Sequence, residues 1–385
     1  MSAPDARVVS IFRLHQFKVS ETFIRAQASK LSRYAPVYTG RIVLGSSNGA
    51  PLVTPRIPDS PFLAAVQTLG QIAFRSADAY ADRLRSFNPS LIHAHFSVDG
   101  VYALPLSRKL NVPLVVTLHG YDVTRSSREM LRSFRPALVN GVVYRRALQR
   151  DVGIFVCVSK FIMKRALDRG YPEEKLRCHY IGVDTAAIQP AERGGDDRLV
   201  VHVGRLVEQK GCRYLLRSMT KLVGRYPDIR LVVIGDGPAR DDLMACAKSL
   251  GVADRVSFLG AMPHRKVLDW LARAAVCVVP SIRVAEGDEE GLGIVCLEAA
   301  ALGTPVIGFD TGGISEAIVH SESGFLVPER DVDGLAHYLS LLLSDADLRR
   351  KMGARGRLRM VEHFDLARQT ARLEEIYDEA LEGRK

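Results

Sequence analysis

The sequence lacks several features that would place it in a familiar class. No segment reaches the roughly 18 apolar residues of a membrane-spanning helix. The first residues, MSAPDARVVSIF, lack the basic, then apolar, then small-residue order of a secretory signal, so we expect the protein to stay in the cytoplasm. The six cysteines form no CxxC pair and mostly lie in apolar segments. This usage is typical of reduced core cysteines rather than of metal ligands or a disulfide framework.

Two phosphate-binding motifs are also missing. There is no Walker A sequence and no GxGxxG, so neither a P-loop nucleotidase nor a standard dinucleotide-binding fold is supported.

Two D-x-D patterns, at residues 331–333 and 345–347, match those of metal-dependent transferases, but both precede expected helices, where Asp acts as a cap or first-turn residue. His93 and His95 alternate along an expected strand, and we expect them to point to opposite faces. We therefore expect no metal site.

The surplus of positive over negative charge is confined to the first half of the chain. Residues 1–190 hold 26 Lys and Arg against 13 Asp and Glu, whereas residues 191–385 hold 27 against 30. A surplus of this kind favours an anionic partner, such as nucleic acid, a phosphorylated substrate or acidic lipid headgroups.

The densest basic stretch is residues 125–150. If its two parts around Pro136 are helical, they carry an apolar stripe flanked by arginines. The stripe is Leu131, Phe134, Leu138 and Val142, and the arginines are Arg128, Arg132, Arg135, Arg145 and Arg146. One interpretation is a helix packed on its domain with a solvated basic edge. The other, which we predict, is peripheral docking on an anionic membrane surface at its inner face.

Short β-branched runs alternate with helical stretches along the whole chain. The runs are residues 8–12, 91–95, 113–120 and 154–159 in the first half, and 199–204, 230–235, 255–260, 276–281 and 305–309 in the second. Continuous apolar strands separated by helices predict parallel sheets covered on both faces. We therefore predict an α/β protein with two doubly wound Rossmann-like domains facing a central cleft.

The predicted domains are residues 1–190 and 191–363, because the Gly-, Pro- and charge-rich segment 189–197 is typical of a linker. A helix over residues 364–385 follows. It carries one apolar face, formed by Leu366, Thr370, Leu373, Tyr377 and Leu381. Such a face must pack on another part of the protein.

Charged residues follow two strands of the second half. Arg205 and Lys210 come after the run 199–204, just before an expected helix, which suits a diphosphate, although two solvated surface cations are the alternative. Glu298 is the only charged residue from Gly293 to Leu302, and a buried carboxylate needs a partner, either a distant Arg or a ligand.

Glu290 lies eight residues before Glu298, a separation of about 12 Å if the segment were wholly helical. Gly291, Leu292 and Gly293 lie between them, at the expected start of the helix, where bare glycines let a phosphate approach free N–H groups. A nucleotide diphosphate sugar spans a similar length from sugar to ribose. The two carboxylates are therefore predicted to bind hydroxyl groups at its two ends.

Five motifs in order resemble those of the family 4 retaining glycosyltransferases of GT-B fold. They are GR-x4-KG (204–211), GDGP (235–238), E-x7-E (290–298), A-x3-GTPVI (299–307) and GG-x-x-E (312–316). The first half adds SETFI (20–24), HAHF (93–96) and HGYD (119–122), which resemble the branch that builds bacterial exopolysaccharide and lipopolysaccharide. Many relatives carry a glycine pair after the first strand, whereas residues 13–21 contain no glycine.

The resemblance implies a role for each matching position. Arg205 and Lys210 would bind the donor pyrophosphate, Glu298 the ribose and Glu290 the transferred sugar. His119 would contact that sugar from the acceptor side, with Glu21, His95 and Asp122 nearby. Backbone around Leu259 to Met262 would frame the base, and the last helix would cross back to the first domain.

The implied reaction moves a hexose from a nucleotide diphosphate sugar to a saccharide or polyprenyl-linked acceptor, with retention of anomeric configuration. No cofactor, metal or nucleic acid is implied. A sugar-nucleotide epimerase of similar fold stays possible, and product analysis without an acceptor separates the two. The third interpretation, a non-enzymatic nucleic-acid or lipid binder, does not explain why carboxylates occur at Glu290 and Glu298.

Overall fold

The computed structural model describes residues 6–18, 21–55, 60–190 and 196–383. It comprises two compact units, which are described separately below. Unit 1 is Met1–Gly182 with Leu366–Lys385, and unit 2 is Val183–Asp365. The division at 182/183 precedes the predicted boundary at 190. Most of the predicted linker, at 191–195, lies outside the described residues, and Asp196 and Asp197 belong to a strand.

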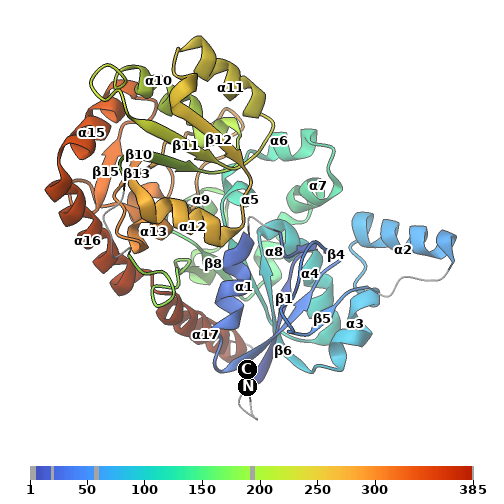
Figure 1. The fold of residues 1–385 in the computed structure, drawn as a ribbon. Coiled ribbons are helices and arrows are strands. Elements are labelled where there is room, and N and C mark those ends of the chain that lie inside the picture. Colours follow the sequence, from blue (N-terminus) through green and yellow to red (C-terminus); the bar gives the residue numbers. More distant parts are fainter. Residues whose placement is uncertain (1–5, 19–20, 56–59, 191–195, 384–385) are drawn as a thin grey trace. The chain divides into compact units, whose positions relative to one another are not determined.

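Unit 1 is built on a seven-stranded sheet in the order β5-β3-β1-β6-β7-β8-β9, in which every pair is parallel (Figure 1). The strands are β1 Arg7–Phe12, β3 Tyr34–Thr39, β5 Leu52–Val53, β6 Pro89–His95, β7 Leu114–Leu118, β8 Ile154–Cys157 and β9 Leu176–Cys178, and a separate pair is formed by β2 His15–Gln16 and β4 Ile42–Val43. The order reverses between β1 and β6.

Unit 2 contains a six-stranded parallel sheet in the order β12-β11-β10-β13-β14-β15. Its strands are β10 Asp196–Val203, β11 Arg230–Ile234, β12 Val256–Gly260, β13 Ala274–Val279, β14 Val306–Phe309 and β15 Gly324–Val327. This order, with its reversal between β10 and β13, is that of a Rossmann fold. The predicted fold class, two doubly wound Rossmann-like sheets, is confirmed.

Each predicted run contains a strand, but six strands were not predicted. They are β2, β3, β4, β5, β9 and β15. Five of these strands are only two to four residues long, which is too short to stand out as a strand in the sequence. The sixth, β3 (YAPVYT), is interrupted by a proline.

Helices cover both sheets. Those of unit 1 are α1 Thr22–Ser29, α2 Pro61–Ala73, α3 Asp78–Arg85, α4 Ser97–Leu110, α5 Tyr121–Thr124, α6 Ser127–Arg132, α7 Pro136–Val143, α8 Arg145–Asp151, α9 Lys160–Asp168 and α17 Leu366–Glu382. Those of unit 2 are α10 Cys212–Thr220, α11 Arg240–Ser249, α12 His264–Arg273, α13 Ile294–Ala301, α14 Ile314–Ala317, α15 Val332–Ser344 and α16 Ala346–His363. Among the described residues, no helix is both long enough and apolar enough to cross a bilayer.

Although it is last in the chain, α17 belongs to the core of unit 1. Leu373 and Tyr377 are 1% exposed and pack with Val9, Leu91 and Val115 of the sheet. The predicted apolar face is largely as expected, because Leu366 and Thr370 are also buried and Leu381 is half-buried.

Four of the six cysteines are buried, as expected of core residues, while Cys178 is exposed and Cys246 is half-buried. None of the six forms a disulfide in the described part of the chain.

Candidate functional site

In unit 2 the polar residues gather at the carboxyl ends of β10 and β13, where the strand order reverses. Ligands of doubly wound sheets bind at this position. Arg205 and Lys210 follow β10, Ser281 follows β13, and Glu290 lies in the loop that leads into α13.

Glycines allow the loops at this edge to pack directly on one another. Gly211 has a φ of +65°, and a Cβ there would lie 1.7 Å from the carbonyl oxygen of Pro280. Gly313 donates its N–H to the carbonyl oxygen of Glu290 at 2.8 Å, and a Cβ on Gly313 would lie 2.1 Å from the carbonyl oxygen of Gly291. The glycines of the GR-x4-KG and GG-x-x-E motifs therefore fix the loop after β10 and the loop that carries Glu290.

Glu290 is held by two partners. Its Oε2 forms an ion pair with the Lys210 ammonium, which also donates a hydrogen bond to it. The same oxygen accepts a hydrogen bond from Ser281 Oγ at 3.2 Å. Burial alone would raise the pKa of Glu290, but the Lys210 charge and these hydrogen bonds hold it below its ordinary value. Glu290 is therefore an ionised carboxylate with a fixed position, and a cation from the loop after β10 lies beside it.

Other predicted donor-binding residues lie around this pair. Arg205 is exposed, and its charge also lowers the pKa of Glu290. Leu292 is buried, and Gly293, with a φ of +77°, is the residue that caps α13. Leu259 lies in β12 and Met262 in the loop after it, and both are half-buried.

Glu298 lies inside α13 and is 8% exposed. Its protein partner is not the arginine that was one of the two alternatives but His264 at the start of α12, whose Nε2 lies 2.6 Å from Glu298 Oε1. This hydrogen bond raises the pKa of His264 above its ordinary value despite partial burial. The sequence reasoning missed His264, which lies 34 residues away in MPHRK with no motif to mark it.

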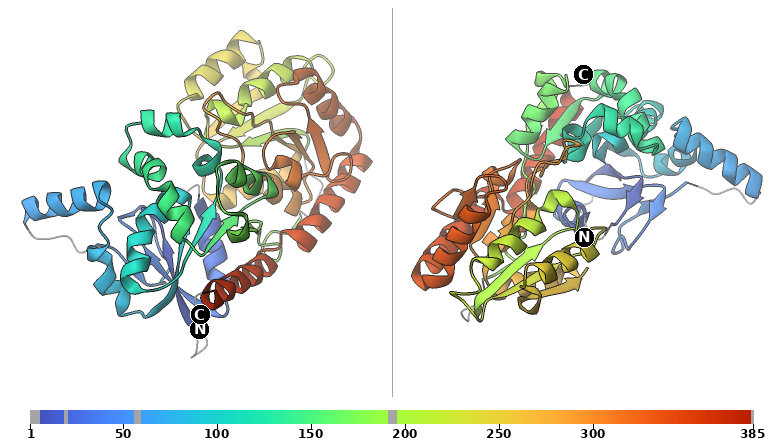
Figure 2. Two further views of the ribbon diagram at one scale, coloured as in Figure 1. Left: turned by 180° about the vertical axis from the view of Figure 1, so that it is seen from behind. Right: turned by 90° about the horizontal axis from the view of Figure 1, so that it is seen from above.

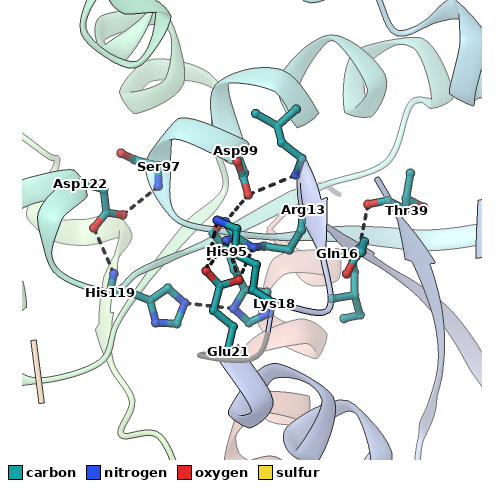
Figure 3. Close-up of polar contacts among 12 residues, drawn as sticks. Arg13, Gln16, Lys18, Glu21, Thr39, His95, Ser97, Asp99, His119 and Asp122 are labelled. Carbon is teal, nitrogen blue, oxygen red and sulfur yellow. Dashed lines mark hydrogen bonds and ion pairs between the residues drawn. The ribbon is translucent and has the colours of Figure 1, made fainter. Parts of the chain in front are cut away.

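In unit 1 the loop after β1 carries a buried ion cluster that the sequence did not predict (Figure 3). The Arg13 guanidinium, 3% exposed, donates from Nη2 to both carboxylate oxygens of Glu21, at 2.7 and 2.6 Å. It also pairs with Asp99 of α4 and donates to the carbonyl oxygen of His95 at 3.0 Å. The loop that was noted for its lack of glycine thus holds a buried cation, Arg13.

Three predicted acceptor-side residues lie beside this cluster. His95 Nδ1 and His119 Nε2 are 3.0 Å apart (Figure 3). Burial lowers the pKa of both imidazoles well below the ordinary value, and the nearby Arg13 charge lowers them further, so both rings are neutral. Asp122 accepts from the backbone N–H groups of Ser97 at 2.8 Å and Gly120 at 2.9 Å, which fixes the turn after His119. The structure therefore brings together Glu21, His95, His119 and Asp122.

The expectation that His93 and His95 point to opposite faces was wrong. Their ring centroids are 4.3 Å apart, because side chains two positions apart on a strand share a face. His93 is a core residue: its two nitrogens contact Tyr377 Oη and Thr117 Oγ1, each at 2.7 Å.

The D-x-D aspartates have the helix-capping role that was predicted. Asp331 accepts from the Gly334 N–H at 2.9 Å at the start of α15, and Asp345 accepts from the Leu348 N–H at 2.8 Å at the start of α16. Over the described parts of the chain, no three His, Cys, Asp or Glu side chains are grouped so that they could hold a metal ion.

The predicted apolar stripe of residues 125–150 does not form. The segment folds as three helices, α6, α7 and α8, and Phe134 has a φ of +51° in the turn before Pro136, which breaks the helical period. Met130 and Leu138 are buried against Val98, whereas Leu131 is 43% and Phe134 90% exposed.

Comparisons with known proteins find relatives over most of the chain. The family model described as Glycosyltransferase Family 4 matches residues 42–187, and the one described as Glycosyl transferases group 1 matches residues 184–359. A GDP-mannose-dependent alpha-(1-6)-phosphatidylinositol monomannoside mannosyltransferase of Mycolicibacterium smegmatis is 33% identical over 293 residues, which are 73% of this chain and 74% of that protein.

A protein of Escherichia coli named putative colanic acid biosynthesis glycosyltransferase WcaL is 30% identical over 259 residues, 66% of this chain and 61% of that protein. Among solved structures, the sucrose-phosphate synthase of Thermosynechococcus elongatus superposes with a TM-score of 0.78 at 21% identity, over 98% of this chain and 100% of that one.

Proposed function

Since the chain belongs to the family 4 glycosyltransferases and has their GT-B fold, we propose that it moves a hexose from a nucleotide diphosphate sugar to a lipid-linked saccharide acceptor with retention of anomeric configuration. The observation that carries the proposal is the Lys210–Glu290–Ser281 arrangement at the strand-order reversal of unit 2. It combines a phosphate-binding cation with a fixed hydroxyl-binding carboxylate.

The donor roles follow from charge and position. Arg205 and Lys210 bind the diphosphate, and Glu290 binds hydroxyls of the transferred sugar. Glu298 binds the ribose diol and exchanges its His264 contact for the ribose hydroxyls. Leu259 and Met262 frame the base, while Gly291, Leu292 and Gly293 leave space for the phosphates before α13.

In this reaction the bond between the anomeric carbon and the diphosphate oxygen breaks, and a bond to the acceptor oxygen forms on the same face of the sugar. The departing phosphate oxygen takes the acceptor's proton. Glu290 is engaged by Lys210 and Ser281, which suits a binding role better than that of a nucleophile. Arg205 and Lys210 stabilise the developing diphosphate charge, an effect typically worth about 3 kcal/mol per donor.

The acceptor side is assigned to unit 1. The neutral His119 imidazole contacts the transferred sugar through a hydrogen bond, and its partner His95 fixes its orientation. Glu21, locked by Arg13, and Asp122 complete this side. The role in exopolysaccharide or lipopolysaccharide synthesis is supported by the similarity to WcaL.

We further propose that the protein works at a membrane surface and that its reaction is independent of metal ions. The excess of Lys and Arg in residues 1–190 supports work at the inner face of an anionic membrane, where a polyprenyl-linked acceptor is found. The reaction needs no metal, because Arg205 and Lys210 supply the positive charge at the diphosphate.

A thermal-shift screen with a panel of nucleotide sugars identifies the donor, and transfer is then measured with and without EDTA. We expect full activity in EDTA and an unchanged anomeric configuration in the product by NMR. Arg205→Ala and Lys210→Ala should each lower turnover about 100-fold with the fold intact. Glu298→Ala should weaken donor affinity.

The matched control is Arg213→Ala, which removes an exposed cation of α10 in the same unit and should leave turnover unchanged. Unchanged turnover in both site variants, a requirement for Mn²⁺ or Mg²⁺, or formation of an epimer without acceptor would each contradict the proposal.

A further inference from the structure

Helix α2 exposes an unusually apolar surface. Residues 61–74, PFLAAVQTLGQIAF, contain no charged side chain. Five large apolar residues are exposed along it, namely Phe62 (74%), Leu63 (53%), Val66 (51%), Leu69 (59%) and Phe74 (73%). Single exposed apolar residues are ordinary, but a contiguous apolar surface on one helix marks an interaction site.

The helix is fixed in place at its C-terminal end. Its Ile72 carbonyl oxygen accepts hydrogen bonds from Asn140 Nδ2 of α7 at 3.0 Å and from Tyr102 Oη of α4 at 2.8 Å. Directly after the helix, the Arg75 guanidinium lies 3.4 Å from the ring centroid of Tyr144. The rest of α2 stands away from the remainder of unit 1 (Figures 1 and 2). The apolar surface is therefore held in a defined orientation rather than packed inward.

The neighbouring helices add cations and further apolar groups. Helix α7 contacts both α2 and α6. Residues 125–150, which form α6 to α8, hold seven arginines and one acidic residue, and Arg128, Arg132 and Arg135 are exposed. Phe134, in the turn between α6 and α7, is 90% exposed, and Val143 is 60% exposed. The surface is thus apolar with a basic border.

This combination selects among possible occupants. A second copy of the chain would bring the same arginines together across a two-fold interface, which is unfavourable. An anionic bilayer provides both an apolar layer and negative headgroups. Helix α2, with 13 residues, is about 20 Å long, too short for the roughly 30 Å hydrocarbon core, so it suits the interface rather than a span.

We propose that α2 and Phe134 insert into the interfacial layer of an anionic bilayer, with Arg128, Arg132 and Arg135 on the lipid phosphates. This deepens the membrane docking of the proposed function, on which it rests for its purpose, the delivery of a lipid-linked acceptor. The insertion itself requires no donor.

Cosedimentation with phosphatidylcholine vesicles, with and without phosphatidylglycerol, measures binding. The wild type should bind the anionic vesicles in the absence of donor. Phe62→Ser combined with Leu69→Ser should weaken binding at least about tenfold. The control, Met244→Ser with Leu358→Ser, removes two apolar side chains of unit 2 that are each 46% exposed, and should leave binding unchanged.

The arginines are tested in the same assay. Arg128→Gln, Arg132→Gln and Arg135→Gln together should weaken binding about 100-fold at low salt, since each cation near the surface contributes a factor of about five. The control replaces Arg225, Arg350 and Arg355, three exposed arginines of unit 2, with Gln and should retain binding.

Insertion itself needs a second readout. The chain has one tryptophan, Trp270 of α12, so Phe134→Trp in a Trp270→Phe background reports on a single position. Its emission should move to shorter wavelength with anionic vesicles. An unchanged emission, equal partitioning of the α2 variant, or a concentration-dependent dimer abolished by Phe62→Ser with Leu69→Ser would overturn the proposal.

The two proposals fail separately. Vesicle binding without any glycosyl transfer would leave the insertion intact and contradict the proposed function. Transfer to a lipid-linked acceptor presented in detergent, without vesicle binding, would contradict the insertion and leave the proposed hexose transfer intact.

Discussion

Glu290 and Glu298 lie on either side of the start of α13, yet different cations hold them. Burial raises the pKa of Glu290, but the Lys210 charge outweighs it and holds this pKa below its ordinary value, so Glu290 is ionised near neutrality. Glu298 is paired with His264, whose charge depends on pH. The ribose-binding carboxylate of the proposal is therefore the one whose environment titrates.

This pairing predicts a pH-dependent stability. The folded pKa of His264 is raised above its ordinary 6.5 by the Glu298 hydrogen bond, so its stabilisation is complete below 6.5 and is lost as pH rises through the raised value. His264→Ala should therefore lower the melting temperature at about pH 5.5 and much less at about pH 8.5. Because the His264 side chain is 42% exposed, we expect about 0.5 kcal/mol at low pH.

The control is His363→Ala, where the exposed histidine lies 3.9 Å from the exposed Glu362 and little change is expected at either pH. In a Glu298→Ala background the effect of His264→Ala should disappear. If His264→Ala lowers the melting temperature at low pH by the same amount in that background, the stabilisation does not come from Glu298.

At the scale of single elements, the proposed donor site depends on how closely neighbouring loops pack. The Ile282 N–H donates to the Gln209 carbonyl oxygen at 2.7 Å, which joins the loop after β13 to the turn before α10. Gly211 lies where this turn meets Pro280, and its positive φ starts α10 in the direction that places Lys210 beside Glu290.

Gly211→Ala should therefore destabilise the protein and displace Lys210. A Cβ at 1.7 Å from a backbone oxygen cannot be accommodated without movement of β13 or α10, and the left-handed conformation adds its own cost. We expect a loss of about 2 kcal/mol or more in denaturant unfolding. Gly224→Ala, in a turn of the same unit with no atom within 4 Å of the added Cβ, should change stability by less than about 0.5 kcal/mol. Equal effects of the two substitutions would contradict this account.

At the scale of the molecule, the two ends of the chain fold together. Glu374 of α17 accepts from the backbone N–H groups of Ser32 and Arg33, each at 2.7 Å, and Tyr377 Oη contacts His93 Nδ1. Unit 1 is therefore complete only after α17 has been made, whereas unit 2 is formed by one continuous segment.

Removal of residues 366–385 should destabilise unit 1 and leave unit 2 folded. The truncation exposes the sheet surface that Leu373 and Tyr377 cover, each 1% exposed in the intact protein. Limited proteolysis should then leave a resistant fragment near Val183–Asp365, while in the intact chain the described parts of unit 1 are resistant as well. A chain that lacks only residues 384–385 is the control. Unaltered resistance of residues 6–182 after the longer truncation would show that α17 is dispensable.

The sequence by itself determined the fold class, because strand and helix periods are local properties of a few residues. It also determined the motif residues at strand ends, because parallel strands bring their carboxyl ends to one edge. The same period of two, correctly applied, places His93 and His95 on one face.

Only the tertiary structure decided which distant residues became partners. Glu298 pairs with His264, and Arg13 joins Glu21 to Asp99, in contacts that depend on how helices pack on a sheet and leave no repeating pattern. Likewise, the apolar composition of α2 is equally typical of a buried helix. Only the tertiary structure shows that α2 contacts α7 while Phe62 and Leu69 stay exposed. Burial depends on what the rest of the chain covers, and no segment encodes that alone.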